Sequence, residues 1–249
     1  LLPGNQPFYE KSMQLWEGLE QDFNYNAMVS QRGILNLSHS DGQHDAYARR
    51  GNAMHLTNSG AVLLDRAGVE RMCPLLDFDN ARFPIKGGIW QPRGGSVRHD
   101  AVAWGYARAC SEMGMDIIQQ CEVTGIRQKN GQVLGVETSK GSIDCEKLGI
   151  VVAGHTGVLA DMAGFRMPVE AVALQALVSE PIKPCMDVVV MANTVHGYMS
   201  QSDKGEMVIG GGADGYNNYT QRGSFHHVEE TVRALIETLP IISRLKMLR

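Results

Sequence analysis

A short buried strand, a pair of glycines and a long amphipathic helix follow one another in the middle of the chain. Residues 87–91 (GGIWQ) have the pattern of a buried strand, and Gly94 and Gly95 form the loop after it. Residues 99–113 form the clearest helical pattern of the sequence, and Gly114 is suited to end it. The predicted apolar face of this helix carries Val102, Ala103, Tyr106, Ala107 and Cys110.

A second junction from strand to helix lies further along the chain. The apolar run 148–153 (LGIVVA) ends at Gly154 and leads into a predicted helix over 157–162, which is typical of an α/β layer. Further helices are predicted at 8–19, in the polar stretch that runs to about Asn58, at 65–72 and at 226–239. The segment 29–37 is predicted to form two strands with a bend at Gly33, and a hairpin turn is predicted at 129–132. The other predicted strands are 116–120, 122–127, 133–139, a strand through Ile143, 173–180, 188–191, 198–201 and 207–211. The sequence therefore predicts a mixed α/β (α+β) fold.

Composition excludes several classes of partner. The formal net charge is −4 and no long Lys/Arg cluster occurs, which argues against nucleic acid and against a polybasic membrane surface. No stretch approaches the roughly 18 consecutive apolar residues that span a bilayer, and the first residues show no secretion signal. The five cysteines are scattered and never form a CxxC pair, which fits neither a disulfide framework nor a zinc site. We predict a cytoplasmic protein without a metal site.

Residues 91–105 (QPRGGSVRHDAVAWG) are the strongest candidate for a binding site. Glycines let the backbone approach a ligand closely, and Arg98 and His99 stand at the start of a helix, where anionic groups are favoured. The alternative is a glycine turn that leads into a helix with an exposed His99. A dyad of His99 with Asp100 is doubtful, because adjacent side chains on a helix do not face each other.

Two other segments invite a functional interpretation. His196 and Tyr198 are two residues apart in a predicted strand, so both would point to one face and could orient a small substrate; the alternative is that both are packed strand residues. The glycine run 210–212 does not have the G-x-G-x-x-G spacing before a helix, and we interpret it as a turn at the end of a strand and not as a nucleotide site.

Five segments, in order, closely resemble the family of beta subunits of heterotetrameric sarcosine oxidases. They are SQRG-x-x-NL at 30–37, QPRGG-x-x-RHDAVAW at 91–104, LQALVSEP at 174–181, HGY-x-SQSDKG at 196–205 and QRGS-x-H at 221–226. The resemblance runs essentially from Tyr9 to Arg249 and is specific, because five separate segments keep the expected order.

The resemblance implies two flavins. The histidine of the RHD motif, here His99, would carry a covalent FMN through the flavin 8α-methyl group, with Arg98 as a cation beside the flavin. In the wider FAD-dependent amine oxidase family, the residue that matches Val123 offers its backbone to the adenine of a non-covalent FAD. Gly154 and His155 end the late strand that borders FAD in that family. On residue pattern alone, the segment around Val123 is only a strand.

The implied reaction is the oxidative demethylation of sarcosine to glycine. Electrons would pass through FAD and FMN to O2, giving H2O2, and the one-carbon unit would leave as formaldehyde or pass to tetrahydrofolate. Tyr198 and His196 are the candidates for contact with the substrate, and the implied partners are the alpha, gamma and delta subunits. The alternatives are an FAD-dependent dehydrogenase of another N-methyl amine, such as dimethylglycine, and a non-catalytic assembly subunit.

The resemblance also implies a larger protein. The FAD fingerprint and the C-terminal glycine-rich segment with its lysine do not occur in the sequence, so we expect them before Leu1 and after Arg249, and expect this piece alone to be inactive. The implied architecture is a partial dinucleotide-binding domain with an inserted antiparallel-sheet substrate domain. We expect mainly substrate-domain elements at 8–87 and 166–225, mainly FAD-domain elements at 88–165 and a return to the FAD domain at 226–249.

Overall fold

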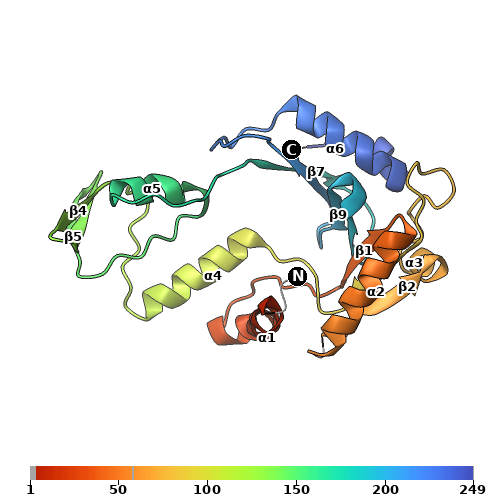
Figure 1. The fold of residues 1–249 in the computed structure, drawn as a ribbon, viewed down its shortest axis with the longest axis horizontal. Helices are drawn as coiled ribbons and strands as arrows, with labels where there is room; N and C mark the ends of the chain where they lie inside the picture. Colours follow the sequence, from red (N-terminus) through yellow and green to blue (C-terminus); the bar gives the residue numbers. More distant parts are fainter. Residues whose placement is uncertain (1–3, 58, 249) are drawn as a thin grey trace. The chain divides into compact units, whose positions relative to one another are not determined.

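The computed structural model describes residues 4–57 and 59–248, which form two compact units (Figure 1). Unit 1 comprises the chain up to Cys110, Leu174–Gly212 and the chain from Gly223 onward, and unit 2 comprises Ser111–Ala173 and Ala213–Arg222. The helix α4 (His99–Glu112) begins in unit 1 and ends in unit 2. Each unit contains one sheet.

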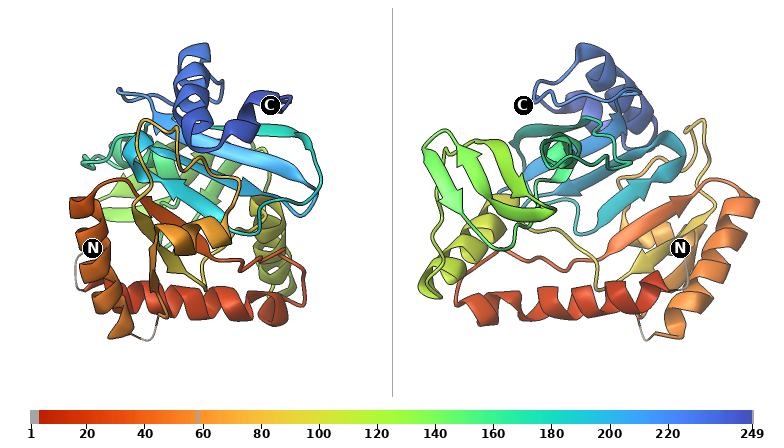
Figure 2. Two further views of the ribbon diagram at one scale, coloured as in Figure 1. Left: turned by 90° about the vertical axis from the view of Figure 1, so that its right-hand side faces the viewer. Right: turned by 60° about the vertical axis from the view of Figure 1, so that its left-hand side comes forward.

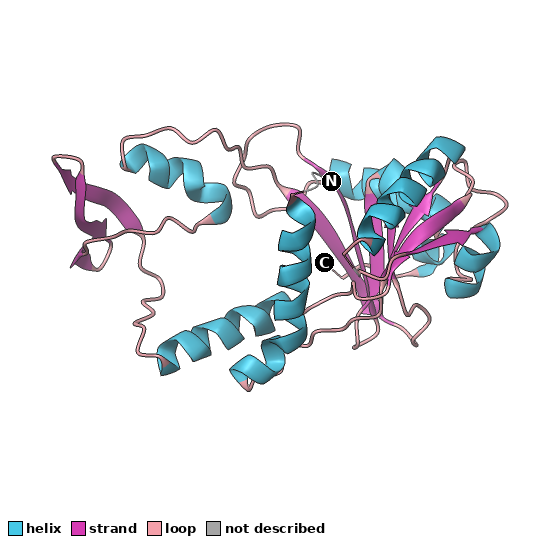
Figure 3. Cartoon of the chain, turned by 60° about the horizontal axis from the view of Figure 1, so that its bottom comes forward, coloured by secondary structure: helices cyan, strands magenta, loops and turns pink. Residues whose placement is uncertain are grey.

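Unit 1 is built on a seven-stranded mixed sheet. In order across the sheet, the strands are β2 (Val62–Asp65), β3 (Gly87–Gln91), β1 (Ile34–Ser38), β8 (Val189–Ala192), β9 (Gly197–Gln201), β10 (Glu206–Ala213) and β7 (Leu174–Pro181). β1 pairs with β8 in parallel, whereas β1–β3, β2–β3, β8–β9 and β9–β10 are antiparallel. Figure 3 shows these strands in magenta.

The remaining elements of unit 1 are helical. They are α1 (Asn5–Phe23), α2 (Asp41–His55), α3 (Arg66–Met72), α6 (Phe225–Thr238), the 3₁₀ helices η2 (Asn193–Val195) and η3 (Pro240–Arg244), and the first part of α4. Three helices begin at a side-chain cap, in which Ser40, Asp65 and Ser224 accept hydrogen bonds from backbone N–H groups of the first turn. The predicted helices at 8–19, 65–72, 99–113 and 226–239 are confirmed. The helix in the polar stretch is also confirmed and ends before Asn58, which lies outside the described residues.

One face of the seven-stranded sheet forms the core of unit 1. Along β1, alternate side chains point to this face, where Leu35 and Leu37 are fully buried with Val190 of β8 and Met199 of β9. α6 covers this face, packing on β7 and β9 with Leu235 (Figure 1). Apolar burial on this face is the main stabilisation of the unit.

The opposite face of the same sheet is only partly covered. α2 packs over one end, where Tyr47 and Ala61 bury Ile89. Asn36, Met191, Tyr198 and Val208 point to this face from β1, β8, β9 and β10, and their side chains are half-buried. We call these four residues the open face.

Unit 2 contains a three-stranded antiparallel sheet (green arrows in Figure 2). Its elements are β4 (Val123–Lys129), β5 (Gln132–Thr138), β6 (Gly141–Asp144), the 3₁₀ helix η1 (Ala153–His155) and α5 (Thr156–Met162). β4 and β5 are joined by Asn130 and Gly131, with φ of 53° and 76°. The predicted hairpin turn is confirmed, because this left-handed pair is the one that Asn-Gly favours.

Two strands predicted in unit 2 are wrong. Residues 116–120 and 148–152 have no regular structure, and Ile118 and Val151 are 53% and 90% exposed. A strand needs a hydrogen-bonded neighbour, and within the described residues neither segment pairs with one. An apolar run indicates that a segment can be buried, but it does not supply the partner strand.

The predicted domain boundaries differ from the observed units. β3 and the first part of α4 belong to unit 1 and not with residues up to 165, since β3 pairs with β1 and β2. The segment 226–249 also belongs to unit 1, where α6 packs on the seven-stranded sheet. Pairing between strands that are distant along the chain decides which unit a segment joins, and the local sequence pattern does not specify this pairing. Which unit binds FAD and which binds substrate stays a prediction.

The cysteines are free thiols in both units. Burial raises the pKa of the Cys73 thiol to about 11, which keeps it protonated and unreactive at neutral pH. Among the described residues, no group of His, Cys, Asp and Glu side chains is arranged to hold a metal ion. None of the helices in the described ranges is both long and apolar enough to cross a bilayer.

Candidate functional site

The first candidate group lies where the loop after β3 enters α4. His99 is the first residue of α4 and its side chain is exposed. An exposed imidazole at the start of a helix has room for a bulky ring against one nitrogen, so the position fits a covalent flavin. The alternative of a glycine turn followed by an exposed histidine has the same geometry, and the role of His99 stays a prediction.

Arg98 is engaged by Asp100. The guanidinium donates from Nε to Oδ1 at 2.8 Å and from Nη2 to Oδ2 at 3.0 Å, which is a bidentate pair. The Asp100 carboxylate also accepts from the backbone N–H of Ala101 at 2.9 Å. Arg98 holds the pKa of Asp100 below its usual value, so this carboxylate is ionised at neutral pH. If Arg98 lies beside a bound flavin, its positive charge is therefore already paired with the carboxylate of Asp100.

Gly94 and Gly95 meet the chain itself. A Cβ built on Gly95 would lie 1.9 Å from the carbonyl oxygen of Ser30, and one on Gly94 would lie 2.7 Å from Cγ1 of Ile34. Ser30 and Ser96 exchange backbone hydrogen bonds of 2.8 and 3.0 Å. Gly95 therefore makes room for the backbone of Ser30, and Gly94 makes room for the side chain of Ile34.

We expect Gly95→Ala to destabilise the protein by about 1–3 kcal/mol, because the new methyl group overlaps the carbonyl oxygen of Ser30, which accepts a hydrogen bond from Ser96 N–H. The midpoint of thermal unfolding of the full-length protein measures the effect. Gly42→Ala is the control, since no atom lies within 4 Å of its added Cβ in α2. Equal midpoints for the Gly95 and Gly42 variants would contradict the packing argument.

The second candidate group is the open face around Tyr198. Tyr198 lies on β9 between Met191 of β8 and Gly210 of β10. A Cβ on Gly210 would be 2.4 Å from Cε1, Cζ and Oη of Tyr198, so the phenol ring lies flat across this glycine. The predicted turn at 210–212 is wrong, because these glycines lie within β10, where Gly210 makes room for the ring of Tyr198.

His196 does not share a strand with Tyr198. It follows η2 in a left-handed conformation, with φ of 53°, and it is exposed. The prediction that both side chains point to one face required two strand residues, so that argument is wrong. Left-handed conformation at a residue that is not glycine is not visible in a hydropathy pattern.

The third candidate group lies in unit 2 at Val123. Val123 is the first residue of β4, which is an edge strand of its sheet. The register shifts between Val123 and Gly125, which marks a β-bulge at Thr124. An edge strand presents backbone groups to a ligand, so Val123 fits the role of offering its backbone to an adenine ring.

Gly154 and His155 lie in η1 and not at the end of a strand. Both are exposed, and the His155 ring stacks on Tyr219 with the centroids 4.8 Å apart and the planes inclined by 28°. Tyr219 reaches His155 from the segment Ala213–Arg222 of the same unit. The sequence contains no local signal for this stack, because the two rings are far apart along the chain.

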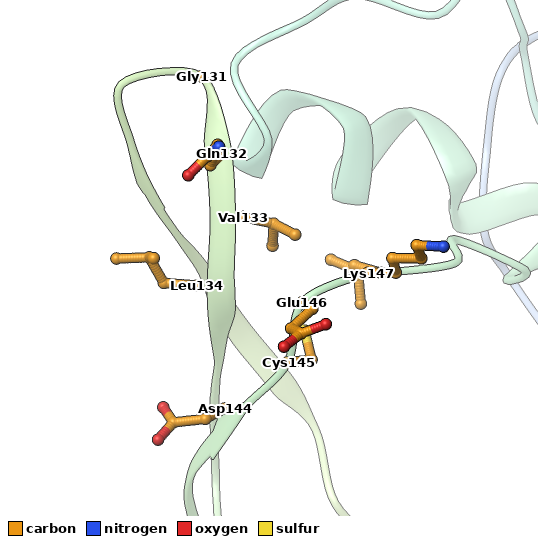
Figure 4. A pocket seen from close by; sticks show the side chains of 9 residues that line it. Gly131, Gln132, Val133, Leu134, Asp144, Cys145, Glu146 and Lys147 are labelled. Carbon is orange, nitrogen blue, oxygen red and sulfur yellow. The ribbon is translucent and has the colours of Figure 1, made fainter.

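A hollow in unit 2 contains none of the predicted site residues (Figure 4). It opens widely to solvent beside the β4–β5 hairpin. Its lining residues are Gly131, Gln132, Val133, Leu134, Asp144, Cys145, Glu146, Lys147 and Leu148. The hollow has no convergent set of charged groups, and we assign it no function.

The apolar face predicted for α4 is only partly correct. Gly105 is the buried residue of the helix, and Trp104 and Tyr106 are 58% and 50% exposed. The α4 surface around the His99 segment is therefore largely uncovered in the described part of the chain.

Comparison with known proteins places this architecture in a family. The family model described as FAD dependent oxidoreductase (DAO) matches residues 2–248. The chain belongs to the FAD dependent oxidoreductase family. The predicted mixed α/β fold of this family is thereby confirmed, and the family implies that FAD is bound.

Two curated relatives are similar along nearly the whole chain. The sarcosine oxidase subunit beta of Rhodobacter capsulatus is 63% identical over 241 residues, which is 97% of this chain and 58% of the relative. The sarcosine oxidase subunit beta of Rhizobium meliloti is 62% identical over 249 residues, which is 100% of this chain and 60% of the relative. The resemblance inferred from motifs is confirmed, and the chain spans about 60% of these relatives' length.

The fold also matches solved structures of other proteins. L-proline dehydrogenase from P. horikoshii superposes with a TM-score of 0.88 at 22% identity, covering 96% of this chain and 64% of that chain. At this identity the match concerns the fold alone.

Proposed function

We propose that this chain is the central part of a sarcosine oxidase beta subunit that carries FMN covalently on His99. The observation that supports this most is the exposed His99 at the start of α4, in a chain so similar to beta subunits of sarcosine oxidases. The proposed reaction consumes sarcosine, O2 and water and yields glycine, formaldehyde and H2O2. Tetrahydrofolate is the proposed alternative acceptor of the one-carbon unit.

Different residues of this chain have different proposed roles in binding the two flavins. When bound, the flavins would supply the redox chemistry, which is the two-electron oxidation of the N-methyl carbon coupled to reduction of O2. An imidazole is a competent nucleophile toward an electron-poor carbon, which is the role proposed for His99. The ion pair of Arg98 with Asp100 borders it. Val123 offers backbone groups to adenine from its edge strand, and Gly154 and His155 line the same cofactor.

Tyr198 is the proposed substrate contact. Its ring lies on the open face, where Met191 and Val208 are apolar and Asn36 is polar. Apolar walls with a few polar groups suit a small amino acid with a methyl group. His196 is exposed next to β9 and is the second proposed contact.

We propose alpha, gamma and delta subunits as partners and the cytoplasm as the location. The relatives' name, subunit beta, supports a complex of several subunits. Five free thiols fit a reducing compartment.

The test is to co-express the full-length protein with its partner subunits and measure H2O2 production with sarcosine and with dimethylglycine. We expect H2O2 with sarcosine, little with dimethylglycine, and yellow colour that remains with the beta subunit after denaturation. Turnover of dimethylglycine with release of all flavin on denaturation would support the dehydrogenase instead. A colourless complex would support an assembly subunit.

A further inference from the structure

Three backbone hydrogen bonds hold the loop that leads to His99. Ser30 N–H donates to Ser96 at 2.8 Å, Ser96 N–H donates to Ser30 at 3.0 Å, and Gly33 N–H donates to Gly94 at 2.8 Å. The loop 92–98 is therefore fixed along one side by the segment 30–33. Its other attachment is a side-chain cluster.

Arg93 of this loop binds two glutamates of α1. Its Nε and Nη2 donate to the two carboxylate oxygens of Glu17 at 2.7 and 2.9 Å, and Nη1 donates to Glu10 at 2.7 Å. Gln31 completes the cluster, since its amide donates to the backbone carbonyl of Arg93 at 2.8 Å and to Glu17 at 3.2 Å. We call Arg93, Glu10 and Glu17 the arginine clamp.

The arginine clamp is charged and partly shielded from water. The side chains of Arg93, Glu10 and Glu17 are 27%, 21% and 33% exposed. Arg93 lowers the pKa of Glu17, and the two glutamates raise the pKa of Arg93, so Glu17 and Arg93 are both charged at neutral pH. A bidentate arginine–carboxylate pair fixes orientation as well as distance, which a single contact does not.

α1 also contacts the chain on the other side of His99. The Phe23 ring meets the Tyr106 ring of α4 edge to face, with centroids 4.6 Å apart. Phe23 and Tyr25 pack so closely on Gly105 that an added Cβ would lie 3.1 Å from Tyr25. α1 and the residues just after it therefore contact the chain on both sides of His99. They contact Arg93, six positions before His99, and Gly105, six positions after it.

Most large apolar side chains of α1 are not buried. Leu19 is its buried residue, and Phe8, Tyr9 and Leu15 are 74%, 59% and 54% exposed. Beyond the contacts given above, Gln6 donates to Ala53 O and Thr57 Oγ1 near the end of α2, both at 2.7 Å (Figure 2). Polar contacts therefore hold α1, together with the aromatic contact of Phe23 on α4.

We propose that the arginine clamp is the positioning device for His99, which holds the loop and the start of α4 at the angle needed for covalent attachment of the flavin. This inference rests on the proposed function and deepens it. Ion pairs with exposed atoms contribute little to the free energy of unfolding, whereas a displacement of a nucleophile by 1 Å lowers its rate steeply. Loss of the clamp should therefore affect attachment far more than stability.

The experiment uses the full-length beta subunit, co-expressed with its partners in a riboflavin-requiring host. Riboflavin is added after synthesis of the protein, and mass spectrometry follows the flavin-modified fraction of the His99 peptide in the soluble, folded complex. The variants are Arg93→Gln, Glu17→Gln and the charge swap that combines Arg93→Glu with Glu17→Arg. The matched control is Arg82→Gln, which breaks the pair of Arg82 with Glu237 of α6 in the same unit.

We expect attachment to be about 10- to 100-fold slower in Arg93→Gln, slower in Glu17→Gln and partly restored in the charge swap. Arg82→Gln should attach flavin at the wild-type rate, and its unfolding midpoint should match that of Arg93→Gln. Wild-type attachment in Arg93→Gln would overturn the positioning inference and leave the proposed function intact. An unmodified His99 in active wild-type enzyme would overturn the covalent assignment, and the inference with it.

Discussion

His99→Ala is expected to remove all covalently bound flavin from the beta subunit. The exposed imidazole at the start of α4 provides the nitrogen to which we propose that the flavin is bonded, and alanine has no such atom. The measurement is the mass of tryptic peptides from the full-length protein co-expressed with its partners. The peptide that contains residue 99 should carry the mass of FMN in the wild type and none in the variant. Sarcosine-dependent H2O2 production should fall to background, since the proposed route of electrons to O2 is lost.

His55→Ala is the matched control for His99→Ala. His55 is an exposed histidine at the end of α2 and has no proposed role. It should keep the flavin on residue 99 and keep the activity. Flavin that stays covalently bound after His99→Ala would move the attachment to another residue, and the covalent role of His99 would be abandoned.

Tyr198→Ala is expected to lower kcat/KM for sarcosine by about 10- to 100-fold, because the ring lies on the open face and is the proposed contact that orients a small substrate there. Tyr198→Phe keeps the ring and tests the hydroxyl alone. Gly210→Ala should have an effect in the same direction without any change to the tyrosine, since the new Cβ lies 2.4 Å from the ring and displaces it. Steady-state oxidation of sarcosine measures all three variants.

Tyr9→Ala is the control for the open face, because Tyr9 is 59% exposed on α1 and contacts Phe8. It should keep the wild-type kcat/KM. The unfolding midpoints should show whether the Tyr198 variants are folded. If folded Tyr198→Ala turns over sarcosine as the wild type does, Tyr198 is a packed strand residue and the proposed contact is wrong.

Local sequence determined most of the elements of this protein. The capped helices, the Asn130–Gly131 hairpin and the strand before Gly94 each depend on residues that are neighbours along the chain. Hydrophobic period and turn chemistry act over a few residues, so they are visible without a structure. The five ordered motifs determined the family for the same reason, because a motif is itself a local pattern.

Only the tertiary structure decided which elements meet. The segment 116–120 and the apolar run 148–152 are not strands, since no described strand pairs with them. β3 joins unit 1 through β1. The arginine clamp on the loop before His99 joins residues 76 and 83 positions apart along the chain. Pairing and ion contacts between distant segments depend on how the whole chain is closed in space, and no local pattern of residues specifies that closure.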